Sequence, residues 1–107
     1  MKRSGVFRSD AAPEGLQISL GAQPIDAIAR ALDFPQWFGG NWDALEDCLG
    51  DLKQPETLLV LRDFRRNEGL GILIDVLSST AQFWSEQGRS FAAVFVDPRR
   101  ELDLPGL

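Results

Sequence analysis

Residues 34–52 read FPQWFGGNWDALEDCLGDL, and the rest of the chain is organised around them. After two aromatic residues and two glycines, Asn41 is a favoured helix N-cap, because its side-chain oxygen can accept one of the unpaired amides of the first turn. Asp43 follows where the helix macrodipole is positive, which favours a carboxylate. Gly50 is of the residue type that often ends a helix in the left-handed conformation. The pattern predicts a short helix over residues 42–49.

Acidic residues are concentrated in and around this predicted helix, at Asp43, Glu46, Asp47 and Asp51. Asp43 and Asp47 are four residues apart and share a helix face, and an acidic face of this kind is often simply solvated. Residues 33–51 hold five carboxylates and no Lys or Arg, so the other 11 of the 16 acidic residues balance the 11 basic ones. The net charge of −5 therefore lies in this stretch. A negative field beside aromatic residues predicts a docking surface for a basic partner.

The composition is that of a soluble globular protein with one domain, since 44% of the 107 residues are hydrophobic and 25% are charged. An isoelectric point near 4.6 argues against direct nucleic-acid binding, which needs a basic surface. The sequence has no apolar run of membrane-spanning length and no hydrophobic signal core near Met1, so we expect a cytoplasmic protein. The single cysteine, Cys48, lies on the apolar face of the predicted helix, which indicates a buried structural thiol rather than a nucleophile.

Hydrophobic periodicity divides the remaining chain into strands and helices. Apolar and polar residues alternate over residues 16–20, as in a half-buried strand. Continuous apolar runs at residues 57–61 and 91–96 indicate strands that are buried on both faces. Helical spacing predicts one helix that begins at Pro24 and a longer helix over residues 72–84.

These elements predict a single small α/β layer domain with a three-stranded, mainly parallel sheet packed by helices. Strands that are separated by helices pair in parallel through crossovers, which favours this arrangement. We expect the domain to span residues 15–97, between a flexible N-terminal arm, residues 1–14, and a C-terminal tail, residues 98–107. The apolar stripe of the long helix includes Phe83 and Trp84, which we expect to lie in the core.

The sequence contains few of the motifs that enzymes use. It has no histidine, which excludes histidine-based triads and most zinc sites. Asp43 and Asp47 could form a carboxylate pair of the glycosidase kind, but an exposed helix offers neither a concave pocket nor a raised pKa. The acidic stretch lacks the spacing of a calcium loop, and the glycine pairs match no phosphate loop. We therefore expect no catalytic residue, no metal site and no cofactor.

The 16 residues 34–49 resemble the signature of the barstar family, intracellular inhibitors of barnase-type ribonucleases. The signature is a proline, two aromatic residues and a glycine, followed by N-x-D-A-L-x-D-C-L on a helix. Beyond it, the order of elements is similar over most of the chain, except before about Gly15 and after Asp97. The resemblance implies a three-stranded parallel sheet packed by helices. It also implies a function, which is to plug a ribonuclease active site with the acidic helix and the aromatic loop before it.

The resemblance also implies which residues contact the partner. Asp47 would be the central anchor, with Asp43 beside it on the same helix. The loop before the helix would add contacts from Trp37, Phe38, Gly39 and Asn41. Glu46 on the acidic helix and Asp75 on the long helix complete the implied binding surface.

The surroundings of the acidic anchor depart from the family pattern. Trp37 and Phe38 stand where the family has two tyrosines, which removes two hydroxyl groups. Gly40 replaces an acidic residue, and Glu46 replaces a large aromatic residue. We expect at least one of the two loop aromatics to be partly exposed, because two adjacent aromatics in a glycine-rich loop cannot easily both be buried. The pattern suits a different ribonuclease as partner, or a partner that is no ribonuclease.

The leading hypothesis is a barstar-like, immunity-type inhibitor that blocks a basic ribonuclease one to one. Such a protein would be a monomer, would bind no nucleic acid itself and would not associate with a membrane. The alternative is a barstar-fold binding module whose basic partner is not a nuclease. An enzyme is a third hypothesis, and it would require a carboxylate whose pKa lies near neutrality.

Overall fold

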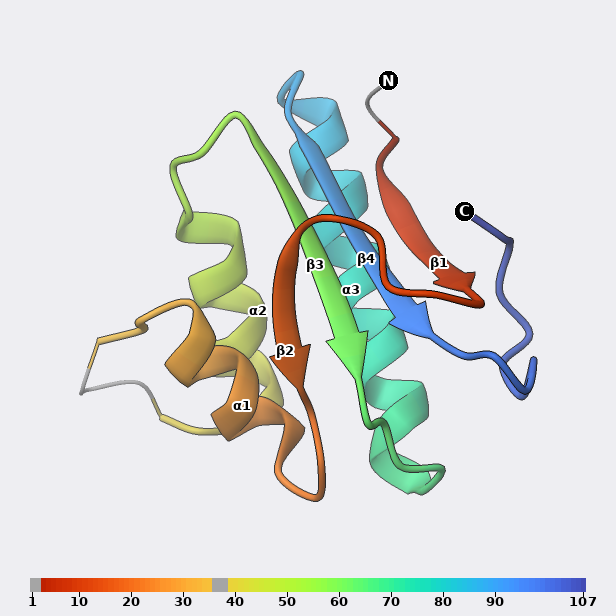
Figure 1. Cartoon of the computed structure of the whole chain (residues 1–107). Helices are drawn as coiled ribbons and strands as arrows, with labels where there is room; N and C mark the ends of the chain where they lie inside the picture. Colours follow the sequence, from red (N-terminus) through yellow and green to blue (C-terminus); the bar gives the residue numbers. More distant parts are fainter. Residues whose placement is uncertain (1–2, 36–38) are drawn as a thin grey trace.

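The computed structural model of the chain describes residues 3–35 and 39–107. Four parallel strands form one sheet, in which the strands lie in the order β1–β4–β3–β2 (Figure 1). The strands are β1 Gly5–Ser9, β2 Leu16–Ser19, β3 Glu56–Arg62 and β4 Ser90–Val96. The two central strands are the continuous apolar runs of the sequence. Residues 59–61 and 91–95 are buried, as expected for strands that are covered on both faces.

The sheet has four strands where three were expected, because residues 5–9 of the expected flexible arm form β1. This strand pairs in parallel with β4 along its whole length. The end of the chain then joins the outer edge of β1. There the backbone N–H of Arg8 donates to the carbonyl oxygen of Pro105, and the N–H of Leu107 donates to the carbonyl oxygen of Arg8, both at 2.9 Å. The first and last segments of the chain therefore widen the sheet beyond β4.

All three helices cover the same face of the sheet (Figure 1). They are α1 Pro24–Ala31, α2 Trp42–Asp51 and α3 Glu68–Glu86. One hydrophobic core joins them to the strands, and its largest fully buried side chains include Trp84, Phe91, Phe95, Ile28, Leu45 and Leu49. The core position expected for Trp84 is thereby confirmed. None of the helices in the described part of the chain combines the length and the apolar character that a membrane crossing needs.

Helices α2 and α3 lie side by side with their starts close together and their ends close together. Near the starts, a Cβ atom on Gly69 would stand 3.5 Å from the ring of Trp42. Near the ends, the indole N–H of Trp84 donates to the carbonyl oxygen of Leu49 at 3.2 Å. The hydrogen bond anchors the last turn of α2 against the longer helix, while Trp42 in the first turn packs against the core.

Two helix boundaries differ from the prediction. Helix α2 begins where expected but continues to Asp51 rather than ending at residue 49. Gly50 therefore lies within the helix, and the prediction of a left-handed cap there was wrong. Helix α3 covers residues 68–86 rather than residues 72–84, because its first turn includes glycines that the hydrophobic pattern did not assign to a helix.

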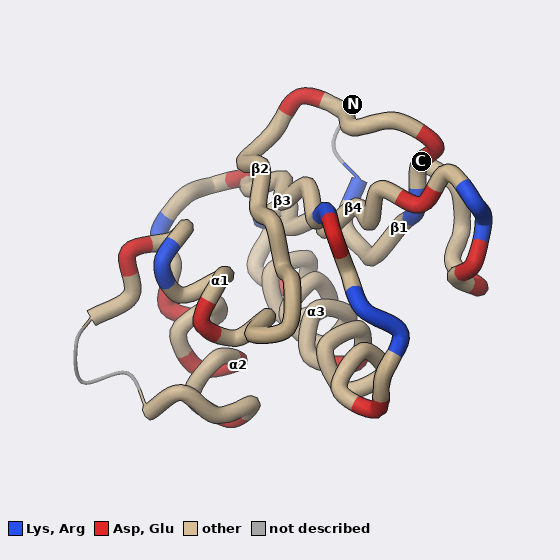
Figure 2. Tube along the Cα trace, turned by 60° about the horizontal axis from the view of Figure 1, so that its bottom comes forward, with Lys and Arg blue, Asp and Glu red and all other residues tan. Residues whose placement is uncertain are grey.

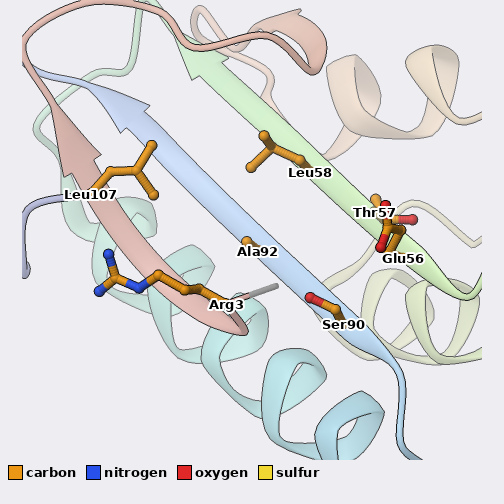
Figure 3. A pocket seen from close by; sticks show the side chains of 7 residues that line it. All are labelled: Arg3, Glu56, Thr57, Leu58, Ser90, Ala92 and Leu107. Atoms are coloured by element: carbon orange, nitrogen blue, oxygen red, sulfur yellow. The ribbon is translucent and has the colours of Figure 1, made fainter. Parts of the chain in front are cut away.

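The face of the sheet opposite the helices is partly covered by the connection between β1 and β2 (Figure 1). This connection passes so close to β3 that a Cβ atom on Gly15 would stand 2.9 Å from both Cγ and the carbonyl oxygen of Leu58. It would also stand 3.0 Å from Cγ2 of Val60. Further along the same face, a shallow trough of about 450 Å³ lies over Leu58 and Ala92 (Figure 3).

Candidate protein-binding site

The turn before α2 fixes the direction in which the helix starts. Gly40 has a φ of +71°, the left-handed conformation that favours glycine. Asn41 then caps the helix, because its Oδ1 accepts a hydrogen bond from the N–H of Ala44 at 2.8 Å. This confirms the predicted N-cap. Gly39 and Asn41 are both exposed, so this end of the loop is accessible to a partner.

The acidic side chains of α2 lie on the side of the helix away from the core. Leu45 and Leu49 are 0% exposed, whereas Asp43, Glu46 and Asp47 are all exposed. None of these three carboxylates forms a hydrogen bond or an ion pair with a residue of the described ranges. The last turn of α2 also holds no basic residue. The exposed face of α2 is therefore a row of negative charges without a neutralising cation among the described residues.

A groove of about 290 Å³ lies beside this row, between α2 and α3. It is lined by Glu46, Asp47, Gly50, Asp51, Ser79, Thr80 and Phe83. The Phe83 side chain is 45% exposed, so the prediction that it lies in the core was wrong. Its neighbour Trp84 fills the core position instead, and one residue along a helix turns the side chain by about 100°.

The ring of Phe83 lies against α2 at Gly50. A Cβ atom on Gly50 would stand 3.5 Å from Cε2 of Phe83, which is an ordinary van der Waals distance, so the ring lies directly over this position. Gly50 therefore lies within the helix beside the ring rather than at the end of the helix. The sequence did not distinguish Phe83 from Trp84, because both fall in the apolar stripe of α3, and adjacent stripe residues such as Val76 and Leu77 are both buried.

The other implied contact residues are not all brought to the groove. Asp75 is exposed on α3, eight residues before Phe83, so the two share a helix face while Asp75 lies outside the groove lining. Trp37 and Phe38 lie outside the described residues, and their expected exposure stays a prediction.

The chemistry of the site suits the recognition of cations. Cys48 is half-buried on α2, and burial, followed by the charges of Asp51 and Asp47, raises the pKa of its thiol. A raised pKa keeps the thiol protonated, which makes it a poor nucleophile. Among residues 3–35 and 39–107, no cluster of three or more His, Cys, Asp or Glu residues is arranged to hold a metal ion. Carboxylates beside an exposed aromatic ring bind guanidinium and ammonium groups well.

A family model described as Barstar (barnase inhibitor) matches residues 14–96. The matched region runs from β2 to β4 with all three helices, and it leaves out β1 and the segment after β4. It includes the whole lining of the groove and the acidic face of α2. Comparison with curated proteins gives no match.

Proposed function

The chain belongs to the barstar family, and from this premise we propose that it inhibits a basic ribonuclease by covering the active site of the enzyme. The covering surface is α2 together with the loop before it. The observation that carries the proposal is the row of exposed α2 carboxylates, which have no partner among the described residues. A ribonuclease active site holds cationic groups that bind the phosphates of RNA, and carboxylates on a helix can take the place of those phosphates.

The anchoring of α2 makes such a surface effective. The Asn41 cap orients the first turn, the Trp84 bond to Leu49 holds the last turn, and Leu45 packs into the core between them. The helix backbone therefore needs little further ordering when a partner binds. Because the ordering of flexible groups reduces affinity, a surface that is already ordered binds more tightly for the same contacts.

The groove between α2 and α3 supports a specific role for one partner side chain. Asp47 belongs both to the acidic row and to the groove, which suits a central anchor. A guanidinium group that enters the groove would lie near the ring of Phe83 and the carboxylates of Asp47 and Glu46. Such a position combines a cation–π contact with charge-assisted hydrogen bonds. Asp43 and Asp75 would contact cations at the rim.

We expect the inhibitor to act as a monomer that binds its enzyme one to one inside the cell, in the manner of an immunity protein. It would use no cofactor, bind no RNA and catalyse no reaction. Gly40 and Glu46, together with Trp37 and Phe38, depart from the family pattern at the surface that contacts the enzyme. The partner is therefore expected to be a ribonuclease whose surface differs from that of barnase.

A second candidate function is a binding module for a basic protein that is not a nuclease. The groove beside Phe83 favours this candidate, because recognition of a single cationic side chain does not require that the partner be a nuclease. The two candidates differ in one measurable respect, since only the first predicts loss of ribonuclease activity in the complex.

The test is a titration of barnase-type ribonucleases, and of ribonucleases from the same source, with the wild-type chain and with Asp47→Asn. We expect one-to-one inhibition by the wild-type chain. The substitution should weaken inhibition by about 30-fold or more, because a charge at the centre of an interface is lost. Residual ribonuclease activity and calorimetric titration give the two affinities.

Asp103→Asn is the matched control, since it removes one exposed carboxylate from the segment after β4. It should leave inhibition unchanged, whereas equal losses for both variants would contradict a specific role for α2. If no ribonuclease binds even at low salt, the inhibitor proposal fails and the search turns to other basic partners.

A further inference from the structure

A second polar cleft, of about 420 Å³, lies at the carboxyl ends of β3 and β4. Arg62 is the last residue of β3, and Arg99 follows β4 by three residues. Figure 2 shows Lys and Arg segments in the stretches that follow both strands, away from α2. In open α/β sheets, the crevice outside the carboxyl ends of parallel strands is a common place for ligands to bind. The cleft shares no lining residue with the groove between α2 and α3.

The Asp97 carboxylate in this cleft is already satisfied within the chain. It is 0% exposed, and it accepts hydrogen bonds from the backbone N–H groups of Glu101 and Leu102 at 2.9 Å each. Nε of Arg8 lies 3.4 Å from its Oδ2. Two backbone N–H groups and the charge of Arg8, which also pairs with Asp10, therefore stabilise the Asp97 carboxylate from behind the cleft and reduce its repulsion of an anion.

The other two carboxylates of the cleft also have partners. Asp63 accepts a hydrogen bond from the hydroxyl group of Ser19 at 2.6 Å. Glu101 lies 3.4 Å from a guanidinium nitrogen of Arg66. Each acidic group on the walls of the cleft is thus engaged by a donor from the same chain.

The two arginines that line the cleft are not engaged in this way. Arg62 and Arg99 are exposed, and neither guanidinium group bonds to another residue of the described ranges. Each of these two arginines is followed by a residue with a positive φ. Asp63 after Arg62 has a φ of +57°, and Arg100 after Arg99 has a φ of +54° and closes a turn onto the carbonyl oxygen of Asp97 at 3.1 Å. The two free cations therefore extend from tight turns.

Phe64 gives the cleft an apolar wall. Its ring is half-buried and packs edge-on against Phe95, with 5.8 Å between the ring centroids. An ordered aromatic wall suits the organic part of a ligand, while the guanidinium groups suit its charged part. The volume lies in the range of small-molecule sites. A long polyanion such as RNA is disfavoured, because the chain as a whole carries a net charge of −5.

We propose that this cleft binds a small phosphate ester, with the phosphate between Arg62 and Arg99 and the organic group against Phe64. Guanidinium groups form paired hydrogen bonds to phosphate oxygens, and a doubly charged phosphate gains more from two arginines than a single carboxylate does. This proposal does not depend on ribonuclease inhibition, since the acidic face of α2 takes no part in it.

The test follows backbone amide signals of the full chain by NMR during titration with phenyl phosphate, and separately with benzoate. We expect saturable shifts for phenyl phosphate in residues 62–64 and 96–101. Arg62→Gln and Arg99→Gln should each weaken binding by about tenfold. Arg30→Gln, which removes an exposed guanidinium from the last turn of α1, should leave binding unchanged.

Both cleft variants should fold normally, because the two side chains make no internal bond to a described residue; matching thermal unfolding curves verify this. Shifts that do not saturate would overturn the proposal. So would a loss of affinity for phenyl phosphate in Arg30→Gln as large as the loss in the two cleft variants. Equal affinity for benzoate would overturn it too, because the cleft would then recognise negative charge rather than phosphate.

Discussion

At the scale of single residues, the buried Asp97 carboxylate connects the end of β4 to the segment that follows it. Burial raises its pKa, but the backbone N–H groups of Glu101 and Leu102 and the charge of Arg8 outweigh this effect and hold the pKa below its usual value. The carboxylate also lies beside the guanidinium of a residue 89 positions earlier in the chain. One side chain thus holds β1, β4 and the end of the chain together.

This arrangement predicts how stability depends on pH. The folded pKa of Asp97 is depressed from its usual 3.8, so its contribution is fully present above about pH 4 and is lost as the pH falls through the folded value. Asp97→Asn should lower the free energy of unfolding at pH 7 by about 1–3 kcal/mol and should flatten its decline at acid pH. Urea denaturation at pH 7 and pH 3 measures both effects. Asp103→Asn, which changes an exposed carboxylate, is the control. An equal loss of free energy of unfolding in this variant would contradict the stabilising role of Asp97.

Phe83 is the residue whose exposure most changes the expected binding surface. Phe83→Ala should weaken binding of the proposed basic partner by about tenfold with little change in stability, because the exposed ring would contact the partner rather than the core. Calorimetric titration measures the affinity. Leu16→Ala, on the edge strand β2, removes a side chain of similar exposure, 40% against 45%, and should leave binding intact. Loss of stability without loss of affinity in Phe83→Ala would show that the ring serves packing instead.

At the scale of elements, the connection between β1 and β2 depends on a close approach that only glycine permits. A Cβ atom on Gly15 would stand 2.9 Å from the carbonyl oxygen of Leu58, and a strand backbone in the middle of a sheet cannot move away easily. Gly15→Ala should therefore destabilise the fold by about 1–3 kcal/mol. Thermal and urea unfolding measure the loss.

Gly71→Ala is the same chemical change as Gly15→Ala, but we expect it to stabilise the protein. Gly71 lies within α3, and a Cβ atom there would meet nothing within 4 Å. Alanine should stabilise the protein by about 0.5–1 kcal/mol, since it is the better helix former. If both variants were equally destabilised, the close approach at Gly15 would not be the cause.

At the scale of the whole molecule, acidic side chains without a bonded partner among the described residues gather on the exposed face of α2. Its carboxylates form no ion pair with a described residue, whereas the arginines at the carboxyl ends of β3 and β4 share their cleft with acidic side chains. In the proposed complex, this acidic face would orient a basic partner toward α2 before contact, and salt would weaken the effect. The association rate should therefore fall by about tenfold or more between 20 mM and 500 mM salt, with a smaller change in the dissociation rate. Stopped-flow measurements separate the two rates, and a salt effect confined to dissociation would contradict electrostatic steering.

Some features of this protein could be predicted from the sequence because they depend on neighbours within one or two turns. The Asn41 cap needs only the amide of Ala44, and the acidic face of α2 follows from the spacing of its carboxylates. The two central strands could be recognised because burial on both faces leaves an uninterrupted apolar run at residues 57–61 and 91–96. Local geometry and composition decide such features before any tertiary contact forms.

Other features were decided only by the tertiary structure. β1 is a strand because residues 5–9 meet an open edge of β4, which begins at Ser90. Phe83 is exposed because Trp84 occupies the core beneath α2, and the apolar stripe of α3 by itself did not distinguish the two. The cleft at the carboxyl ends of β3 and β4 exists because the ends of two strands that are far apart in the chain lie side by side. Pairing between distant segments depends on which surfaces remain uncovered after the core has packed, and no local pattern of residues contains that information.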